Sequence, residues 1–196
     1  MVTDGKDQVY FLNESNPLSF SIHKLNIGKD TDLKLEPAVS FNSDKFDFEY
    51  KDDNGISNKF DHKQFIPKNL FYDQQSDRLF VVGSVYNRDM TMYYQVYPSV
   101  KLIAWDKSGD FDGDIDFIQP SDDGQTFYIS STLKNMIYAV HEGERISNSP
   151  HFCIDGDRAN RFIPLLDKGR LFVLDLKNKM MKEVSPDPGT RVVATL

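Results

Sequence analysis

Five oxygen-bearing side chains at alternate positions form the densest group of candidate metal ligands in the sequence. They are Ser108, Asp110, Asp112, Asp114 and Asp116. Calcium takes six to eight oxygen ligands, and a loop that offers one at every second residue can turn them toward a single ion. The pattern therefore predicts a candidate calcium loop, with calcium as the candidate cofactor.

The same segment departs from the calcium pattern toward its end. When Ser108 takes the first position of such a loop, Gly113 falls at the sharp turn, but Gln119 stands where a glutamate is expected. When Asp110 takes the first position, the string GDFDGD resembles the core of the calcium loops in FG-GAP propeller repeats, but Ile118 occupies a later ligand position. The alternative, which we prefer because aspartate is abundant throughout the chain, is a solvated acidic connection between strands.

Side chains that could carry out catalysis form no recognisable motif. The histidines are scattered along the chain: His23, His62, His141 and His151. No two of them have the i,i+4 spacing of a helical zinc motif. Ser84 lies in Val-Gly-Ser-Val and lacks the second glycine of a nucleophile elbow. The single cysteine, Cys153, excludes an internal disulfide and a cysteine-based zinc site, so we interpret it as a half-buried side chain. No catalytic residue is assigned.

Length and composition set the class of protein. The 196 residues carry a net charge of −7 and 39% hydrophobic residues, which is typical of a folded globular chain. An acidic balance without a basic run argues against nucleic acid as a partner. No apolar run approaches the about 18 residues of a membrane span, and MVTDGKDQVYFL does not have the pattern of a signal peptide.

Alternating apolar residues and turn residues predict short antiparallel strands rather than helices. Phe20 and Ile22 alternate with Ser21 and His23, as in a half-buried strand. Residues 125–130 and 136–140 predict a hairpin, and residues 78–82, 100–105, 170–174 and 179–184 predict further strands. Residues 67–73 are interpreted as the approach to a turn and residues 87–98 as an irregular excursion. Residues 41–63 form either a surface insertion or an extra hairpin.

The chain repeats one pattern, a turn followed by a strand with an aromatic residue at a fixed place. The aromatic anchors are Tyr10, Phe80, Phe127 and Phe172, which are 70, 47 and 45 residues apart. A period in the forties, built from strands and turns, predicts the blades of a β-propeller. The 70-residue separation between Tyr10 and Phe80 contains either one blade with the 41–63 insertion or two blades with one anchor unrecognised. A β-sandwich or barrel with chance spacing is the alternative fold.

Three stretches resemble blades of six-bladed propellers of the yellow/major royal jelly and gluconolactonase-like group. They are VYFLNESNPLSFSIHKL, LFYDQQSDRLFVVGS leading to KLIAWD, and DFIQPSDDGQTFYISS. The resemblance implies an all-β propeller, or a partial one of about four antiparallel blades, so that residues 1–196 are a single domain or part of one. It also implies a secreted or cell-surface protein, although the paired cysteines of secreted members are absent. The lactonase relatives hold a divalent metal, but none of its ligands can be matched to this sequence.

Two functions from different classes follow. The first is a non-enzymatic propeller that binds a small molecule or a protein through the loops between strands, with the ligand on the channel axis, as the resemblance implies. The second is a metal-dependent lactonase or hydrolase on the same scaffold, and a structural interaction module is a third alternative. Tyr93, Tyr94 and Tyr97 are candidate pocket residues, whereas Trp105 ends an apolar strand and is interpreted as core.

Overall fold

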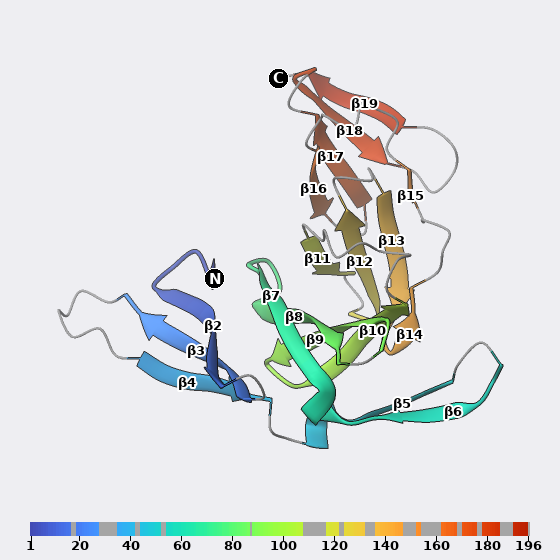
Figure 1. Cartoon of the computed structure of the whole chain (residues 1–196). Helices are drawn as coiled ribbons and strands as arrows, with labels where there is room; N and C mark the ends of the chain where they lie inside the picture. The colour runs from blue at the N-terminus through green and yellow to red at the C-terminus, as the bar shows by residue number, and fades with distance from the viewer. Residues whose placement is uncertain are drawn as a thin grey trace. The chain divides into compact units, whose positions relative to one another are not determined.

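The computed structural model of the chain is an array of antiparallel sheets joined by turns and short 3-10 helices (Figure 1). It describes residues 1–16, 19–27, 35–41, 44–51, 54–86, 88–107, 117–121, 124–131, 136–146, 152–153, 162–167, 170–175, 178–184 and 190–195. The chain divides into two compact units, Met1–Gly109 and Asp110–Leu196. Each unit is described by itself.

The first unit contains two sheets and a hairpin. The first sheet has the order β1 (Val2–Thr3), β2 (Gln8–Asn16), β3 (Ser19–Asn26) and β4 (Leu35–Ser40). The second sheet places β7 (Phe65–Asp73), β8 (Arg78–Val85), β9 (Met90–Tyr97) and β10 (Lys101–Lys107) side by side. Between them in sequence lie η1 (Asp44–Phe46), the hairpin β5 (Phe48–Lys51) and β6 (Ser57–Phe60), and η2 (His62–Gln64).

The second unit also contains two four-stranded sheets. One sheet has the order β11 (Phe117–Pro120), β12 (Thr126–Ser131), β13 (Met136–His141) and β15 (Phe152–Cys153), and the short strand β14 (Glu144–Arg145) follows β13 in sequence. The other has the order β16 (Phe162–Asp167), β17 (Arg170–Asp175), β18 (Met180–Val184) and β19 (Thr190–Thr195). Neighbouring strands in these sheets are antiparallel.

The aromatic anchors occupy equivalent places in the four sheets. Tyr10 lies in β2, Phe80 in β8, Phe127 in β12 and Phe172 in β17, so each lies in the second strand of its sheet. Tyr10, Phe80 and Phe127 are buried. The predicted fold class, all-β with about four antiparallel sheets of the blade type, is confirmed. The 70-residue separation between Tyr10 and Phe80 therefore corresponds to one sheet plus the β5–β6 hairpin.

One segment was assigned wrongly from the sequence. Residues 87–98 contain β9, which is a regular strand paired on both sides within its sheet rather than an irregular excursion. Met92, Tyr93 and Tyr94 are buried in succession, so the strand is covered on both faces and shows no apolar–polar alternation. Residues 67–73, interpreted as the approach to a turn, are part of β7 and lead into the turn at residues 74–77. The register shift after Pro67 accommodates the proline in the strand.

The core of the first unit is rich in aromatic rings. Phe41 and Phe46 have ring centroids 5.0 Å apart, and the ring of Tyr94 lies 5.2 Å from both Phe46 and Phe65. The Tyr94 hydroxyl donates to the carbonyl oxygen of Phe46 at 2.9 Å. Apolar burial and one satisfied polar group therefore fix η1 against β9.

No helix among the described residues is both long and apolar enough to cross a membrane.

Candidate binding cleft

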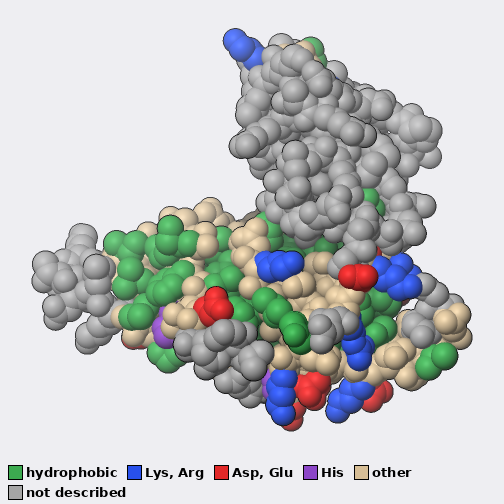
Figure 2. Space-filling model, viewed as in Figure 1, with side chains coloured by type: hydrophobic (Ala, Val, Ile, Leu, Met, Phe, Trp, Pro, Cys, Tyr) green, Lys and Arg blue, Asp and Glu red, His purple; other side chains and the backbone are tan. Residues whose placement is uncertain are grey.

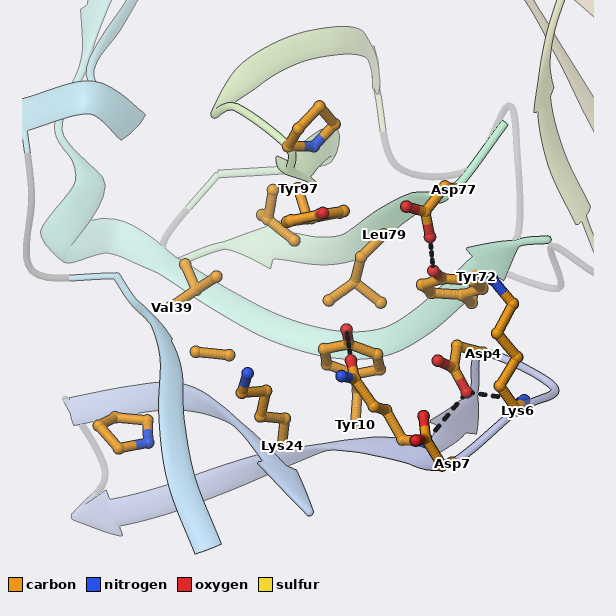
Figure 3. Close-up of a pocket in the computed structure, with 15 residues that line it drawn as sticks. Asp4, Lys6, Asp7, Tyr10, Lys24, Val39, Tyr72, Asp77, Leu79 and Tyr97 are labelled. Carbon is orange, nitrogen blue, oxygen red and sulfur yellow. Dashed lines mark hydrogen bonds between the residues drawn. The ribbon is translucent and has the colours of Figure 1, made fainter. Parts of the chain in front are cut away.

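A cleft of about 560 Å³ lies between the first and second sheets of the first unit (Figure 3). The β1–β2 turn contributes Asp4, Lys6 and Asp7, and the first sheet adds side chains from β2, β3 and β4. The second sheet contributes residues of β7, β8 and β9 and of the turn between β7 and β8. The volume of the cleft falls within the range of sites that hold small molecules.

The β1–β2 turn has the local chemistry that fixes one rim of the cleft. An oxygen of the Asp4 carboxylate accepts the backbone N–H groups of Lys6 at 2.9 Å and Gln8 at 3.0 Å. Gly5 has a φ of 77°, which glycine adopts without a steric penalty. Carboxylate and glycine together close the turn and place the Lys6 and Asp7 side chains at the rim.

Tyrosine rings form the wall between the two sheets. The rings of Tyr10 and Tyr72 are stacked, with centroids 5.6 Å apart and planes 15° from parallel. The Tyr10 hydroxyl donates to the side-chain oxygen of Gln8 at 2.7 Å, and the Tyr72 hydroxyl donates to the carboxylate of Asp77. Figure 3 shows Tyr97 across the cleft from Tyr10, and Tyr97 is 43% exposed. Tyr97 therefore offers exposed aromatic surface to a ligand, Tyr72 is half-buried, and the buried Tyr10 ring supports Tyr72 from the first sheet.

Burial keeps the two stacked hydroxyls protonated. Burial raises the pKa of Tyr10 above its ordinary value, and the nearby Asp4 adds to the effect. Burial raises the pKa of Tyr72 as well, and its hydrogen bond to Asp77 raises it further. Both groups therefore remain neutral over the physiological pH range.

These two pKa values predict a loss of stability in alkaline solution. Above about pH 10 an unfolded tyrosine releases its proton, whereas the folded side chains with raised pKa retain theirs, so ionisation favours unfolding. We expect the free energy of unfolding to fall as the pH rises above about 10 and to fall less steeply in Tyr72→Phe. Urea unfolding of both proteins from pH 8 to pH 11 measures the two slopes. Equal slopes of the free energy of unfolding against pH would show that the pKa of Tyr72 is the same in the folded and the unfolded chain.

Charges of both signs surround the tyrosines. Asp4, Asp7 and Asp77 line the cleft together with Lys6 and Lys24. The Lys24 ammonium lies 3.3 Å from a carboxylate oxygen of Glu36. On the face that Figure 2 shows, acidic and basic side chains also lie near each other, and hydrophobic side chains gather over the first sheet. The cleft offers hydrogen-bond donors, acceptors and apolar rings, and its described lining contains no histidine, cysteine or serine.

The structure separates the four aromatic residues that the sequence singled out. Tyr97 lines the cleft, as expected of a pocket residue. Tyr93 and Tyr94 are 0% and 1% exposed and belong to the interior instead. Trp105 is 5% exposed, which confirms its interpretation as core.

His23 is not among the described lining residues of the cleft. The candidate calcium loop, Ser108, Asp110, Asp112, Asp114 and Asp116, lies outside the described residues and stays a prediction. His23 points away from Ile22 and Lys24 by strand alternation, and its Nε2 lies 3.0 Å from the hydroxyl oxygen of Ser21.

The sequence did not single out Tyr72 or Asp77 as site residues. Asp77 has a φ of 56°, a conformation that aspartate tolerates in turns. The sequence indicated that residues 67–73 lead into a turn, and the hydrogen bond from the Tyr72 hydroxyl to Asp77 depends on the geometry of that turn.

No family model matches the chain, and no curated protein matches it either. Among solved structures, a luciferin-regenerating enzyme is similar at a TM-score of 0.48 with 14% identity, over 97% of this chain and 63% of that one. The periplasmic gluconolactonase of Pseudomonas aeruginosa is similar at 0.42 with 14% identity, over 97% and 54%. The β-propeller domain of Cps50 (Swd1) from Myceliophteria thermophila is similar at 0.38 with 11% identity, over 92% and 57%.

The chain spans less than two thirds of the length of each of these three structures. The fold class rests on the sheets described above, because all three TM-scores lie below 0.5. A gluconolactonase is among the similar structures, and the likeness to the yellow/major royal jelly proteins stays a prediction.

Proposed function

We propose that the chain is a non-enzymatic binding module that holds a small polar molecule in the cleft between its first two sheets. The observation that carries the proposal is the three-tyrosine lining, Tyr10, Tyr72 and Tyr97, set among carboxylates and ammonium groups. Aromatic faces take up the apolar side of a ring, and the surrounding polar groups bind its hydroxyls or amides. A short saccharide or a similar polyhydroxylated ring has this combination.

The arrangement favours binding over covalent chemistry. Asp77 is engaged by the Tyr72 hydroxyl, and Asp4 by two backbone N–H groups. These carboxylates therefore serve to hold the walls of the cleft in place. The site lies between two sheets of one unit, so we place the ligand there rather than on a channel axis.

Replacing Tyr97 with alanine is expected to abolish ligand binding, because the residue lines the cleft, and to leave the fold intact, because the residue is 43% exposed. The protein is titrated with a panel of methyl glycosides and polyols, and binding is measured by calorimetry and by the increase in melting temperature that ligand produces. We expect at least one compound to raise the melting temperature of the unaltered protein and not that of Tyr97→Ala. The enthalpy signal should disappear in the variant as well.

Tyr86→Ala is the matched control, because Tyr86 is an exposed tyrosine of the first unit (57%) that is not among the described lining residues. Equal responses of the Tyr97 and Tyr86 variants would place the ligand elsewhere. If no compound of the panel binds, the proposal that the cleft holds a small polar ligand is contradicted. Hydrolysis of a sugar lactone by the purified chain would contradict the non-enzymatic assignment and favour the lactonase alternative.

A further inference from the structure

The base of the β5–β6 hairpin brings together two aspartates that are far apart in sequence. Phe48 pairs with Phe60 at the start of the hairpin, so Asp47 and Asp61 take the next position on each side. Like charges at opposite positions of a strand pair destabilise it. A cation at the base of the hairpin would remove this cost.

A histidine lies next to both carboxylates. The Nδ1 atom of His62 is 2.7 Å from Oδ1 of Asp47 and 3.6 Å from Oδ1 of Asp61. One ligand atom from each of the three side chains can be chosen so that all lie within 4.8 Å of one another. Zinc bonds of about 2.0–2.2 Å in a tetrahedron separate ligand atoms by about 3.3–3.6 Å. The distance from His62 to Asp61 matches this separation, and the distance from His62 to Asp47 is shorter, so Asp47 and His62 must move slightly apart to bind one ion.

The surrounding structure holds these three side chains in position. Phe46 and Phe60, the residues before Asp47 and Asp61, are 1% and 0% exposed and anchor the two segments in the core. Oδ1 of Asp47 accepts the backbone N–H of His62 at 3.0 Å. Oδ1 of Asp61 accepts the backbone N–H of Lys63 at 2.9 Å. Such supporting hydrogen bonds orient metal ligands in proteins.

The Lys59 ammonium lies 3.7 Å from Oδ2 of Asp47 and would compete with a metal ion for this carboxylate. The Lys59 side chain is 66% exposed, so it can swing into solvent at little cost. An imidazole with two carboxylates suits zinc and its neighbours in the first transition row, whereas calcium prefers oxygen ligands alone.

We propose that Asp47, Asp61 and His62 bind one zinc-class divalent cation that joins the two ends of the β5–β6 hairpin. These three residues are neither among the described lining of the tyrosine-lined cleft nor among the residues of the candidate calcium loop. Three protein ligands leave a fourth tetrahedral position for water.

The test uses the full chain, freed of metal with a chelator and then titrated with zinc chloride alone. We expect one equivalent to bind by calorimetry and the melting temperature to rise. Asp61→Asn should weaken zinc binding at least tenfold, while asparagine keeps the N-cap acceptor and hence the local fold. His62→Gln should weaken it at least as much, and circular dichroism should show that both variants remain folded.

His141→Gln is the matched control, because His141 is an exposed histidine in the second unit. It should bind zinc as the unaltered chain does. Cobalt in place of zinc should give the visible absorption of a tetrahedral site, lost in His62→Gln. Undiminished zinc binding by both ligand variants would overturn the proposal, as would a chain that responds to calcium but not to zinc.

Discussion

Replacing Phe46 with alanine is expected to lower the free energy of unfolding of the first unit by about 3–5 kcal/mol. Phe46 is 1% exposed, and its ring contacts those of Phe41 and Tyr94 at centroid distances of 5.0 and 5.2 Å. The loss combines apolar burial with the cavity that the missing ring leaves between η1 and β9. Urea unfolding, followed by tryptophan fluorescence of Trp105, measures it.

Two further variants separate the cavity from other effects of the substitution. Phe46→Leu fills part of the space and should cost less than Phe46→Ala. Tyr86→Ala removes an aromatic ring of the same unit that is 57% exposed, and its effect should stay within about 0.5 kcal/mol. A loss below about 1 kcal/mol for Phe46→Ala would show that η1 contributes little to the core.

Replacing Gly83 with alanine is expected to destabilise the second sheet by about 1–3 kcal/mol, although alanine normally favours folding over glycine. A Cβ atom at this position would lie 2.4 Å from the carbonyl oxygen of Ile66 and 2.6 Å from the ring of Phe65. The oxygen belongs to the backbone of β7 and cannot rotate away. The β7–β8 ladder must therefore shift where Pro67 pairs with Gly83.

Hydrogen exchange distinguishes this clash from a general loss of stability. Amides of β7 and β8 near residue 83 should exchange faster in Gly83→Ala than amides elsewhere in the sheet. Ser84→Ala, one position along the same strand and only half-buried, should leave the local exchange unchanged. A Gly83→Ala protein as stable as the original would show that β7 can move aside without cost.

The repeat could be predicted from sequence because its signal is local. A turn next to an aromatic strand residue is visible within seven residues, and it placed Tyr10, Phe80, Phe127 and Phe172 in equivalent strands. Strand β9 was missed because burial on both faces removes the alternation on which the prediction depends. The local pattern therefore identifies half-buried strands better than fully buried ones.

The candidate sites could be predicted only in part, because their residues are distant in sequence. Tyr10 and Tyr72 stack only when the first and second sheets face each other, and no spacing in the sequence encodes that contact. Asp47 and His62 meet because a hairpin of intervening residues returns the chain. Tyr97 could be selected from its residue type, but its exposure separates it from Tyr93 and Tyr94 only in the folded chain.

Within β1–β4, β7–β10, β11–β13 and β16–β19, strands that pair are successive along the chain. The stretch of polypeptide that must be closed to form each pairing is therefore short, and its entropic cost is low. Low contact order of this kind favours rapid folding in small domains. A sheet can accordingly assemble during translation as soon as its last strand has been synthesised, before the rest of the polypeptide follows.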